Sequence, residues 1–140
     1  MLTRLPFYGR LYNWYAVNDS RKIAPVGWHV PSDAEWQRLV DQLGGSSVAG
    51  GGKLKEAGTA HWNSPNTGAD HSSGFSALPG GYRYFGDGHY CPMGSYATFW
   101  SSTECDYSNA WYRSLSYDTS GVNRGLGSKQ SGFSVRCVRD

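Results

Sequence analysis

The side chains that could carry out catalysis or bind a metal are few and widely spaced in this sequence. They are four histidines and three cysteines, His29, His61, His71, His89, Cys91, Cys105 and Cys137. Zinc sites need close pairs such as C-x-x-C or H-E-x-x-H, and neither pattern occurs. The G-x-S-x-G turn of serine hydrolases and the EF-hand calcium loop are also missing. We therefore expect no enzyme activity, no cofactor and no metal.

Several of these groups have simple local explanations. His29 lies beside a predicted helix start, where a hydrogen-bonded structural role is expected. Cys137 falls on the inner side of a predicted strand, which indicates an unreactive core thiol. Asp70 and Asp87 lie in loops near histidines and offer ligands for calcium. We interpret both as solvated carboxylates, with a calcium site as the alternative.

The remaining chemistry is concentrated in residues 101–132, which are rich in Tyr, Ser, Gly, Asn, Asp and Thr. Tyrosine offers a large contact area and loses little rotamer freedom on binding, and the small polar residues offer adaptable hydrogen bonds. Antibody paratopes use the same mixture. The composition therefore indicates a binding surface. The alternative is the polar outer face of an ordinary hairpin.

Two helices are predicted ahead of this segment. Ser32 and Glu35 form the pattern of a capping box, in which each side chain bonds the backbone of the other. An apolar stripe at helical spacing follows and ends at a glycine pair, which predicts a helix over residues 33–43. A shorter helix is expected over residues 52–57, and the following residues read as a long loop.

The strand predictions rest on alternation and on β-favouring residues. An opening strand is expected over residues 7–17, and further strands over 75–84, 96–102 and 132–140. A strand, one or two helices and then several short strands predict an α+β domain.

Residues 111–124 give the clearest hairpin signal, two alternating runs joined by the turn D-T-S-G. One face of the first run carries Trp111, Arg113, Leu115 and Tyr117. The other face carries Tyr112, Ser114, Ser116 and Asp118. The segment is therefore predicted to be folded, with one inner face and one outer face.

The size and charge of the chain exclude several classes of protein. At 140 residues it is long enough for one domain with its own core. The net charge of +2 gives no reason to expect a nucleic-acid partner. There is no apolar run of about 18 residues, so we expect no membrane insertion. The first ten residues lack the apolar core of a signal peptide.

The motifs of the chain resemble one known family along nearly its whole length. These motifs are YGRLYNWYAVND, GWHVPSDAEW, GGKLKEAGTAHWNSPNTGA, SGFSALPGGYR, FWSSTE, NAWYRSL and GFSVRCVRD. Together they resemble the Fibrobacter succinogenes major paralogous domain, with the match running from about residue 8 to residue 140. That family is similar to the formylglycine-generating-enzyme branch of the C-type lectin fold. The resemblance implies an α+β body with close terminal strands and a loop-rich upper half.

A narrower resemblance concerns the variable proteins of diversity-generating retroelements in gut Bacteroides and their phages. In those proteins a C-terminal segment is rewritten at adenine-rich codons, mostly asparagine codons, while the residues between them hold the backbone. The resemblance implies a diversified ligand-binding segment at about residues 105–131. Residues that such rewriting permits are Cys105, Asp106, Tyr107, Tyr112, Ser114, Ser116, Tyr117, Asp118, Thr119, Gly121, Asn123, Gly125, Leu126, Gly127, Ser128 and Ser131. The scaffold would be Trp111, Arg113, Leu115 and Val122.

Two departures limit what the resemblance carries over. Family members often read CPEGWHVP, with a cysteine that pairs with the one in the closing strand. Here Ala24 stands in its place, so Cys137 is expected to lack that partner. The oxidase chemistry of the formylglycine branch needs reactive cysteines, which Cys105 and Cys137 do not offer. We carry over the fold and not the catalysis.

The sequence thus predicts a binding module of receptor or adhesion type, with Tyr107, Tyr112 and Tyr117 as contact residues. Its partner would be a protein or glycan on a bacterial surface. The domain itself would be located at the cell surface, in the extracellular space or on a virion. The sequence does not decide whether the domain forms a homo-oligomer. The alternatives are a structural module without diversification, a calcium-dependent lectin and a formylglycine-type oxidase.

Overall fold

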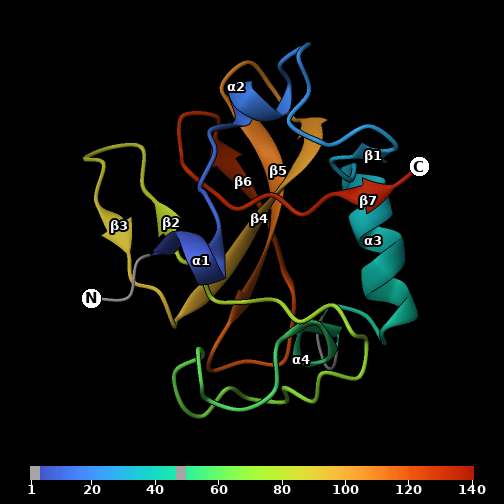
Figure 1. Cartoon of the computed structure of the whole chain (residues 1–140), viewed down its shortest axis with the longest axis vertical. Coiled ribbons are helices and arrows are strands. Elements are labelled where there is room, and N and C mark those ends of the chain that lie inside the picture. Colours follow the sequence, from blue (N-terminus) through green and yellow to red (C-terminus); the bar gives the residue numbers. More distant parts are fainter. Residues whose placement is uncertain (1–3, 47–49) are drawn as a thin grey trace.

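The computed structural model describes residues 4–46 and 50–140 and combines short helices with antiparallel strands (Figure 1). The helices are α1 (Arg4–Tyr8), α2 (Trp14–Val17), α3 (Asp33–Gln42) and α4 (Gly50–Leu54). The strands are β1 (Trp28–His29), β2 (Tyr82–Arg83), β3 (Tyr90–Cys91), β4 (Tyr96–Glu104), β5 (Asn109–Ser116), β6 (Asn123–Ser128) and β7 (Val138–Arg139). This mixture agrees with the α+β prediction. Among the described residues no helix is long and apolar enough to cross a bilayer.

The central element is the three-stranded sheet β4-β5-β6, whose neighbouring strands are antiparallel. It confirms the predicted hairpin and extends it to residues 109–128. Residues directly opposite one another share a face of the sheet. Thr98, Ser114 and Asn123 are aligned in this way and define what we call the front face. Phe99 and Arg113 define the back face.

The back face packs against α3 and carries the larger hydrophobic cluster. Trp36 and Val40 of α3 meet Phe99 and Leu115 of the sheet, and the Trp36 and Phe99 rings lie 5.7 Å apart. Leu54, Trp62, Ala77, Ala97 and Val122 complete this cluster. A fully buried side chain of this size contributes roughly 1.5–3 kcal/mol to folding. The back face is therefore where the sheet is fixed to the rest of the chain.

The front face is covered at one end only. Phe133 packs on Trp100 with 4.2 Å between ring centroids, and Trp14 and Ala110 complete this smaller cluster. The indole Nε1 of Trp14 donates to the carbonyl of Ser101 at 2.9 Å. Beyond this cluster the front side chains Thr98, Ser114 and Asn123 line an open hollow, with Thr98 nearly buried at its base.

Helix α3 forms where the sequence predicted it. Ser32 Oγ accepts from the backbone N–H of Glu35, and the Glu35 carboxylate accepts from the N–H of Ser32 at 2.8 Å. The helix ends at Gln42, and Leu43 caps it ahead of Gly44, which has a positive φ. The capping box and the apolar residues at helical spacing were therefore sufficient to predict where this helix begins and ends.

The predicted opening strand over residues 7–17 is wrong. The segment forms α1 and α2, and only Tyr12 pairs with another chain segment, at Phe133. Gly9 has φ +69°, which breaks an extended run, and the Asn13 side chain accepts from the N–H of Ala16 to start α2. Residues that favour strands were overridden by a turn and a cap.

Other predicted bounds also shift. The second helix is α4, which begins two residues earlier than expected and ends at Leu54. Its glycines permit close approach, since a Cβ on Gly51 would lie 2.0 Å from the carbonyl oxygen of Gly121. Of the expected strand over 75–84, only β2 forms. Of the expected strand over 132–140, only β7 forms, and Cys137 is half-buried, which raises the pKa of its thiol.

His29 connects three parts of the chain. Its Nδ1 lies 2.7 Å from the Asp140 carboxylate next to β7, and its Nε2 lies 2.9 Å from the Glu35 carboxylate of α3. The bonds to Asp140 and then Glu35 raise the pKa of His29 above its ordinary value, against a smaller opposing effect of burial. The expected hydrogen-bonded structural role is confirmed.

Replacing His29 with Gln is expected to destabilise the fold more at low pH than at high pH. Because the folded-state pKa is raised, the charged imidazole stabilises the fold fully below its unfolded pKa of about 6.5, and this contribution is lost as the pH rises through the folded value. Urea unfolding of both proteins at about pH 5.5 and about pH 8.5 measures this difference. The control is His89→Gln, since the His89 imidazole bonds Asp87 two residues away and joins no distant part of the chain by a hydrogen bond among the described residues. An equal loss for His29→Gln at both pH values would contradict the prediction.

Candidate functional site

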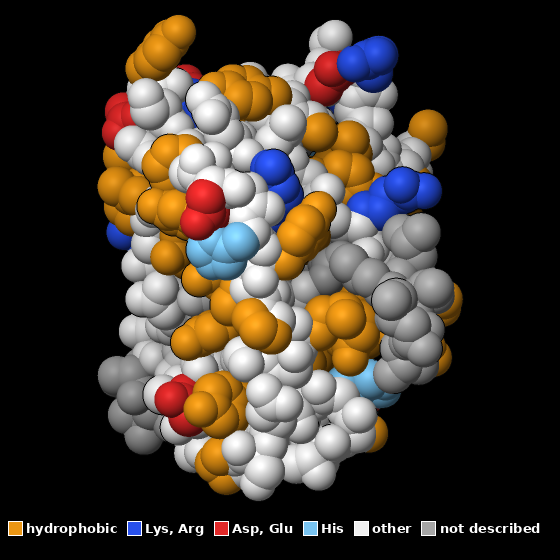
Figure 2. Space-filling model, turned by 90° about the vertical axis from the view of Figure 1, so that its left-hand side faces the viewer, with side chains coloured by type: hydrophobic (Ala, Val, Ile, Leu, Met, Phe, Trp, Pro, Cys, Tyr) orange, Lys and Arg blue, Asp and Glu red, His pale blue; other side chains and the backbone are white. Residues whose placement is uncertain are grey.

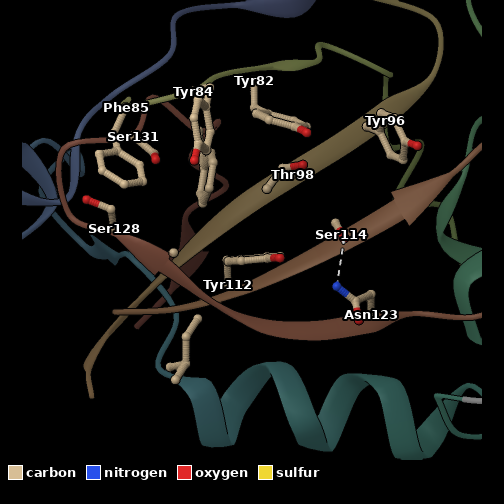
Figure 3. A pocket seen from close by; sticks show the side chains of 13 residues that line it. Tyr82, Tyr84, Phe85, Tyr96, Thr98, Tyr112, Ser114, Asn123, Ser128 and Ser131 are labelled. Atoms are coloured by element: carbon tan, nitrogen blue, oxygen red, sulfur yellow. Dashed lines mark hydrogen bonds between the residues drawn. The ribbon is translucent and has the colours of Figure 1, made fainter. Parts of the chain in front are cut away.

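The open part of the front face forms two adjoining hollows. The first, which we call the aromatic hollow, has a volume of about 370 Å³ and lies between β2, β4, β5, β6 and the segment that follows β6 (Figure 3). The second, the turn hollow, has a volume of about 650 Å³ and lies at the β5–β6 turn. Tyr96, Ser114 and Asn123 line both, so the two hollows form one front groove.

One side of the aromatic hollow is an aromatic wall made of Tyr82, Tyr84, Phe85 and Tyr96. The Tyr84 and Phe85 rings lie 5.0 Å apart, and these two residues are 43% and 45% exposed. Figure 2 shows hydrophobic side chains spread over the side of the molecule that carries β2 and β3, with a few charged and histidine side chains between them. Sequence reasoning missed this wall, although the aromatic density of residues 82–90 was an available signal.

The opposite side of the groove is built from the segment that the sequence singled out. Eleven of the sixteen predicted binding residues line the groove, namely Tyr112, Ser114, Ser116, Asp118, Thr119, Gly121, Asn123, Leu126, Gly127, Ser128 and Ser131. They come from β5, the β5–β6 turn, β6 and the residues just after β6. The structure thus brings most of these residues together on one concave surface.

Three predicted residues lie apart from the groove, in the β4–β5 turn. Cys105 and Tyr107 are exposed, Tyr107 to 94%. The Asp106 carboxylate accepts hydrogen bonds from Asn109 and from the backbone N–H of Ser108, and these bonds lower its pKa. Asp106 therefore shapes the turn.

The other two predicted residues are constrained by packing. Tyr117 packs against the back-face cluster, in agreement with its place in the alternation. Gly125 lies under the Tyr112 ring, and a Cβ there would come within 2.6 Å of the ring. Gly127 lines the groove but is buried, and a Cβ there would lie 2.7 Å from the Phe133 ring. Glycine at position 127 is therefore needed for the front cluster to close.

The scaffold residues are held from behind by charged groups. The Arg113 guanidinium, 2% exposed, bonds the Asp33 carboxylate of α3, and Arg124 bonds the same carboxylate at 2.8 Å. Burial raises the pKa of Asp33, but the hydrogen bonds from Arg124 and Arg113 outweigh burial and hold it below its ordinary value. Arg124 also lies 3.4 Å from the centre of the Trp111 ring. Of the other scaffold residues, Leu115 and Val122 are buried.

Two buried lysines hold the turns at the ends of the hairpin. Lys129 donates to Glu104 at 2.7 Å and to the carbonyl of Tyr107 at 3.1 Å. Lys55 donates to the carbonyls of Thr67 at 2.8 Å, Ser116 at 2.9 Å and Thr119 at 2.8 Å.

Burial lowers the pKa of Lys55 to about 8, and nearby Asp118 opposes this shift. At neutral pH the ammonium group is therefore mostly charged and offers three donors for the three carbonyls. Sequence reasoning missed both lysines, because lysine is rarely fully buried.

Comparison with known proteins gives a family. Residues 3–139 match the Fibrobacter succinogenes major domain. The chain belongs to this family. The Fibrobacter succinogenes major domain therefore accounts for nearly the whole sequence, including α3, the aromatic wall and the hairpin. Comparisons with curated proteins and with solved structures found no match.

The chemistry of this Fibrobacter succinogenes major domain can be judged from its donor groups. His61 and His89 are each bonded to a nearby carboxylate, of Glu56 and Asp87 respectively, and neither lines the groove. Over residues 4–46 and 50–140 no cluster of three His, Cys, Asp or Glu residues is arranged to hold a metal ion. The cysteines Cys91, Cys105 and Cys137 are free. The groove offers aromatic rings, hydroxyls, the Asn123 amide and, in the turn hollow, the Asp118 carboxylate.

Replacing Lys55 with Met is expected to reduce the free energy of unfolding by roughly 1–3 kcal/mol, because three backbone carbonyls lose the buried ammonium group that bonds them while the volume is kept. Chemical denaturation monitored by tryptophan fluorescence measures the change. Lys53→Met, a half-buried neighbour in α4, is the matched control and is expected to change stability by less than about 0.5 kcal/mol. Equal effects of the two substitutions would show that Lys55 does not hold the β5–β6 turn.

Proposed function

We propose that this domain binds ligands through the front groove, with residues of the 105–131 segment forming an exchangeable part of the binding surface. The observation that carries the proposal is the division of the hairpin into two faces. Back-face residues are buried or bonded to charged partners, whereas front-face residues such as Ser114 and Asn123 line an open concavity. Side chains on the open face can change without disturbing the back.

The proposal includes a C-type lectin-like architecture of the formylglycine-generating-enzyme type and diversification by a retroelement. The pairing of β1 with β7, close to the end of the described chain, agrees with such an architecture. The concentration of eleven predicted residues on the groove is what diversification of a ligand site requires. The absence of a metal-ligating cluster among the described residues gives no support to a calcium-dependent lectin.

The partner we propose is a protein or glycan on a bacterial surface, met at a cell surface, outside the cell or on a virion. A protein partner of standard size would bury about 800 Å² on each side, which the groove and its rim can supply. The second candidate is a structural module whose groove faces only water. The exposed rings of Tyr84 and Phe85 favour binding, since structural surfaces rarely keep adjacent rings open.

Sequence differences among sibling copies of the gene would test diversification directly. We expect them at groove positions such as Tyr112, Ser114, Ser116 and Asn123. Arg113 and Lys129 are expected to be constant although they lie in the same segment, because their charged groups bond inside the fold. Gly127 is expected to be constant although it lines the groove, because a side chain there would meet the Phe133 ring. Sequencing the gene and its neighbours in related isolates measures this, together with the presence of a reverse transcriptase and a template repeat. Differences spread evenly over front and back positions would contradict the proposal.

Two display libraries would test the binding surface without a known ligand. The first library randomises Tyr112, Ser114, Ser116 and Asn123 on the front, and most clones are expected to fold because these side chains line an open groove. The matched library randomises Arg113, Leu115 and Val122, and most of its clones are expected to unfold. Surface expression and protease resistance give the folded fraction, and selection against a panel of proteins and glycans gives the binders. Equal folded fractions, or no binders from the front library, would contradict the proposed function.

A further inference from the structure

The two walls of the aromatic hollow come from different parts of the chain. The aromatic wall lies before residue 105, and the facing wall, with Tyr112, Ser114, Ser128 and Ser131, lies in the 105–131 segment (Figure 3). If the segment is exchangeable, as proposed above, the aromatic wall is the same in every version of the site. The aromatic wall and Thr98, which precede the segment, therefore set the class of ligand. Residues of the segment, Ser131 among them, select within that class.

Two nearly buried hydroxyl groups line this hollow without a partner. Thr98 is 3% exposed and Ser131 is 4% exposed, and both line the aromatic hollow. Thr98 comes from the floor of the hollow on β4, while Ser131 lies across the hollow near Ser128 (Figure 3). In the part of the chain that the structure describes, neither hydroxyl has a hydrogen-bond partner. Both hydroxyls line the hollow, so a ligand that displaces water from it must supply each of them with a hydrogen-bond partner.

The lining of the aromatic hollow is also free of charge. It contains no Asp, Glu, Lys, Arg or His side chain. A charged ligand would lose hydration there without gaining a counter-charge. The lining instead alternates aromatic rings with hydroxyls that can both donate and accept. The ligand should therefore be uncharged, carry donors and acceptors together, and present an apolar face.

We propose that the aromatic hollow binds an uncharged saccharide, and that this inference rests on the binding function proposed above. The apolar C–H face of a sugar ring would pack on Tyr84 and Phe85, which are open to solvent. The sugar hydroxyls would pair with Thr98 and Ser131 at the base. A volume of about 370 Å³ falls within the range of about 300–1,000 Å³ of small-molecule sites. A proline-rich peptide would pack on the rings equally well and could accept from the two hydroxyls through its carbonyls, whereas a sugar hydroxyl can both donate to and accept from each of them.

A glycan array that carries neutral and acidic oligosaccharides, probed in the presence of EDTA, tests the proposal. Binding to neutral glycans is expected to survive the chelator. The variants Thr98→Val, which keeps the side-chain shape, and Tyr84→Ala are each expected to weaken it about tenfold. The matched control is Tyr90→Ala on the same β2–β3 hairpin, which is 65% exposed and lies outside the hollow. If Thr98→Val unfolds, Ser131→Ala replaces it. Circular dichroism establishes the folded state of each variant.

Weak binding is measured by NMR with methyl glycosides of glucose, galactose, mannose and N-acetylglucosamine, where the Thr98 methyl signal is expected to shift. The saccharide proposal is overturned by binding confined to acidic glycans or to proline-rich peptides. It is also overturned if neither the array nor NMR detects neutral sugars, or if the wall variants leave sugar binding unchanged. If the front library still yields binders in any of these cases, the general binding function stands although the saccharide proposal has failed. The two proposals can therefore fail separately.

Discussion

The interaction on which the architecture depends is the buried pairing of Arg113 with Asp33. It joins the middle strand of the central sheet to the first turn of α3, at a point where the guanidinium is almost entirely removed from water. A buried charge that loses its partner is strongly destabilising, by roughly 3–5 kcal/mol, so the helix and the sheet must keep this relative position. The Asp33 carboxylate also holds Arg124, and through it Trp111, so one acidic group orders two strands.

This arrangement separates the functions of the two faces of the sheet. The guanidinium of Arg113 and the larger hydrophobic cluster lie behind the hairpin. Lys129 holds the β4–β5 turn and Lys55 holds the β5–β6 turn, in both cases through backbone carbonyls. Bonds to carbonyls depend on the course of the backbone and not on the identity of the side chains in the turn. The front side chains outside the Trp100–Phe133 cluster, such as Ser114 and Asn123, therefore contribute little to the fold, which is the property that a variable binding surface needs.

The sequence predicted the elements that depend on local pattern. Helix α3 followed from its capping box and stripe, and the hairpin followed from alternation around Leu115. The opening strand failed because Asn13 and Gly9 imposed a cap and a turn on residues that otherwise favour strands.

Contacts between segments far apart in the sequence could not be predicted from local sequence patterns. The aromatic wall meets the hairpin across some 30 residues of sequence, and the fit of Gly127 under Phe133 depends on a chain crossing that no short motif encodes. The buried lysines were missed for the same reason, because their acceptors are carbonyls of remote turns.

The long irregular segment between α4 and β2 has a consequence for the thermodynamics of recognition. The Asn66 amide donates to the carbonyls of Glu56 and Gly58, and Lys55 joins Thr67 to the β5–β6 turn. Thr67, the residue of this stretch that lines the turn hollow, is thereby held in place at its rim by hydrogen bonds on both sides. A preorganised rim loses little conformational entropy when a ligand arrives, so affinity can be gained even from a shallow surface with modest contacts.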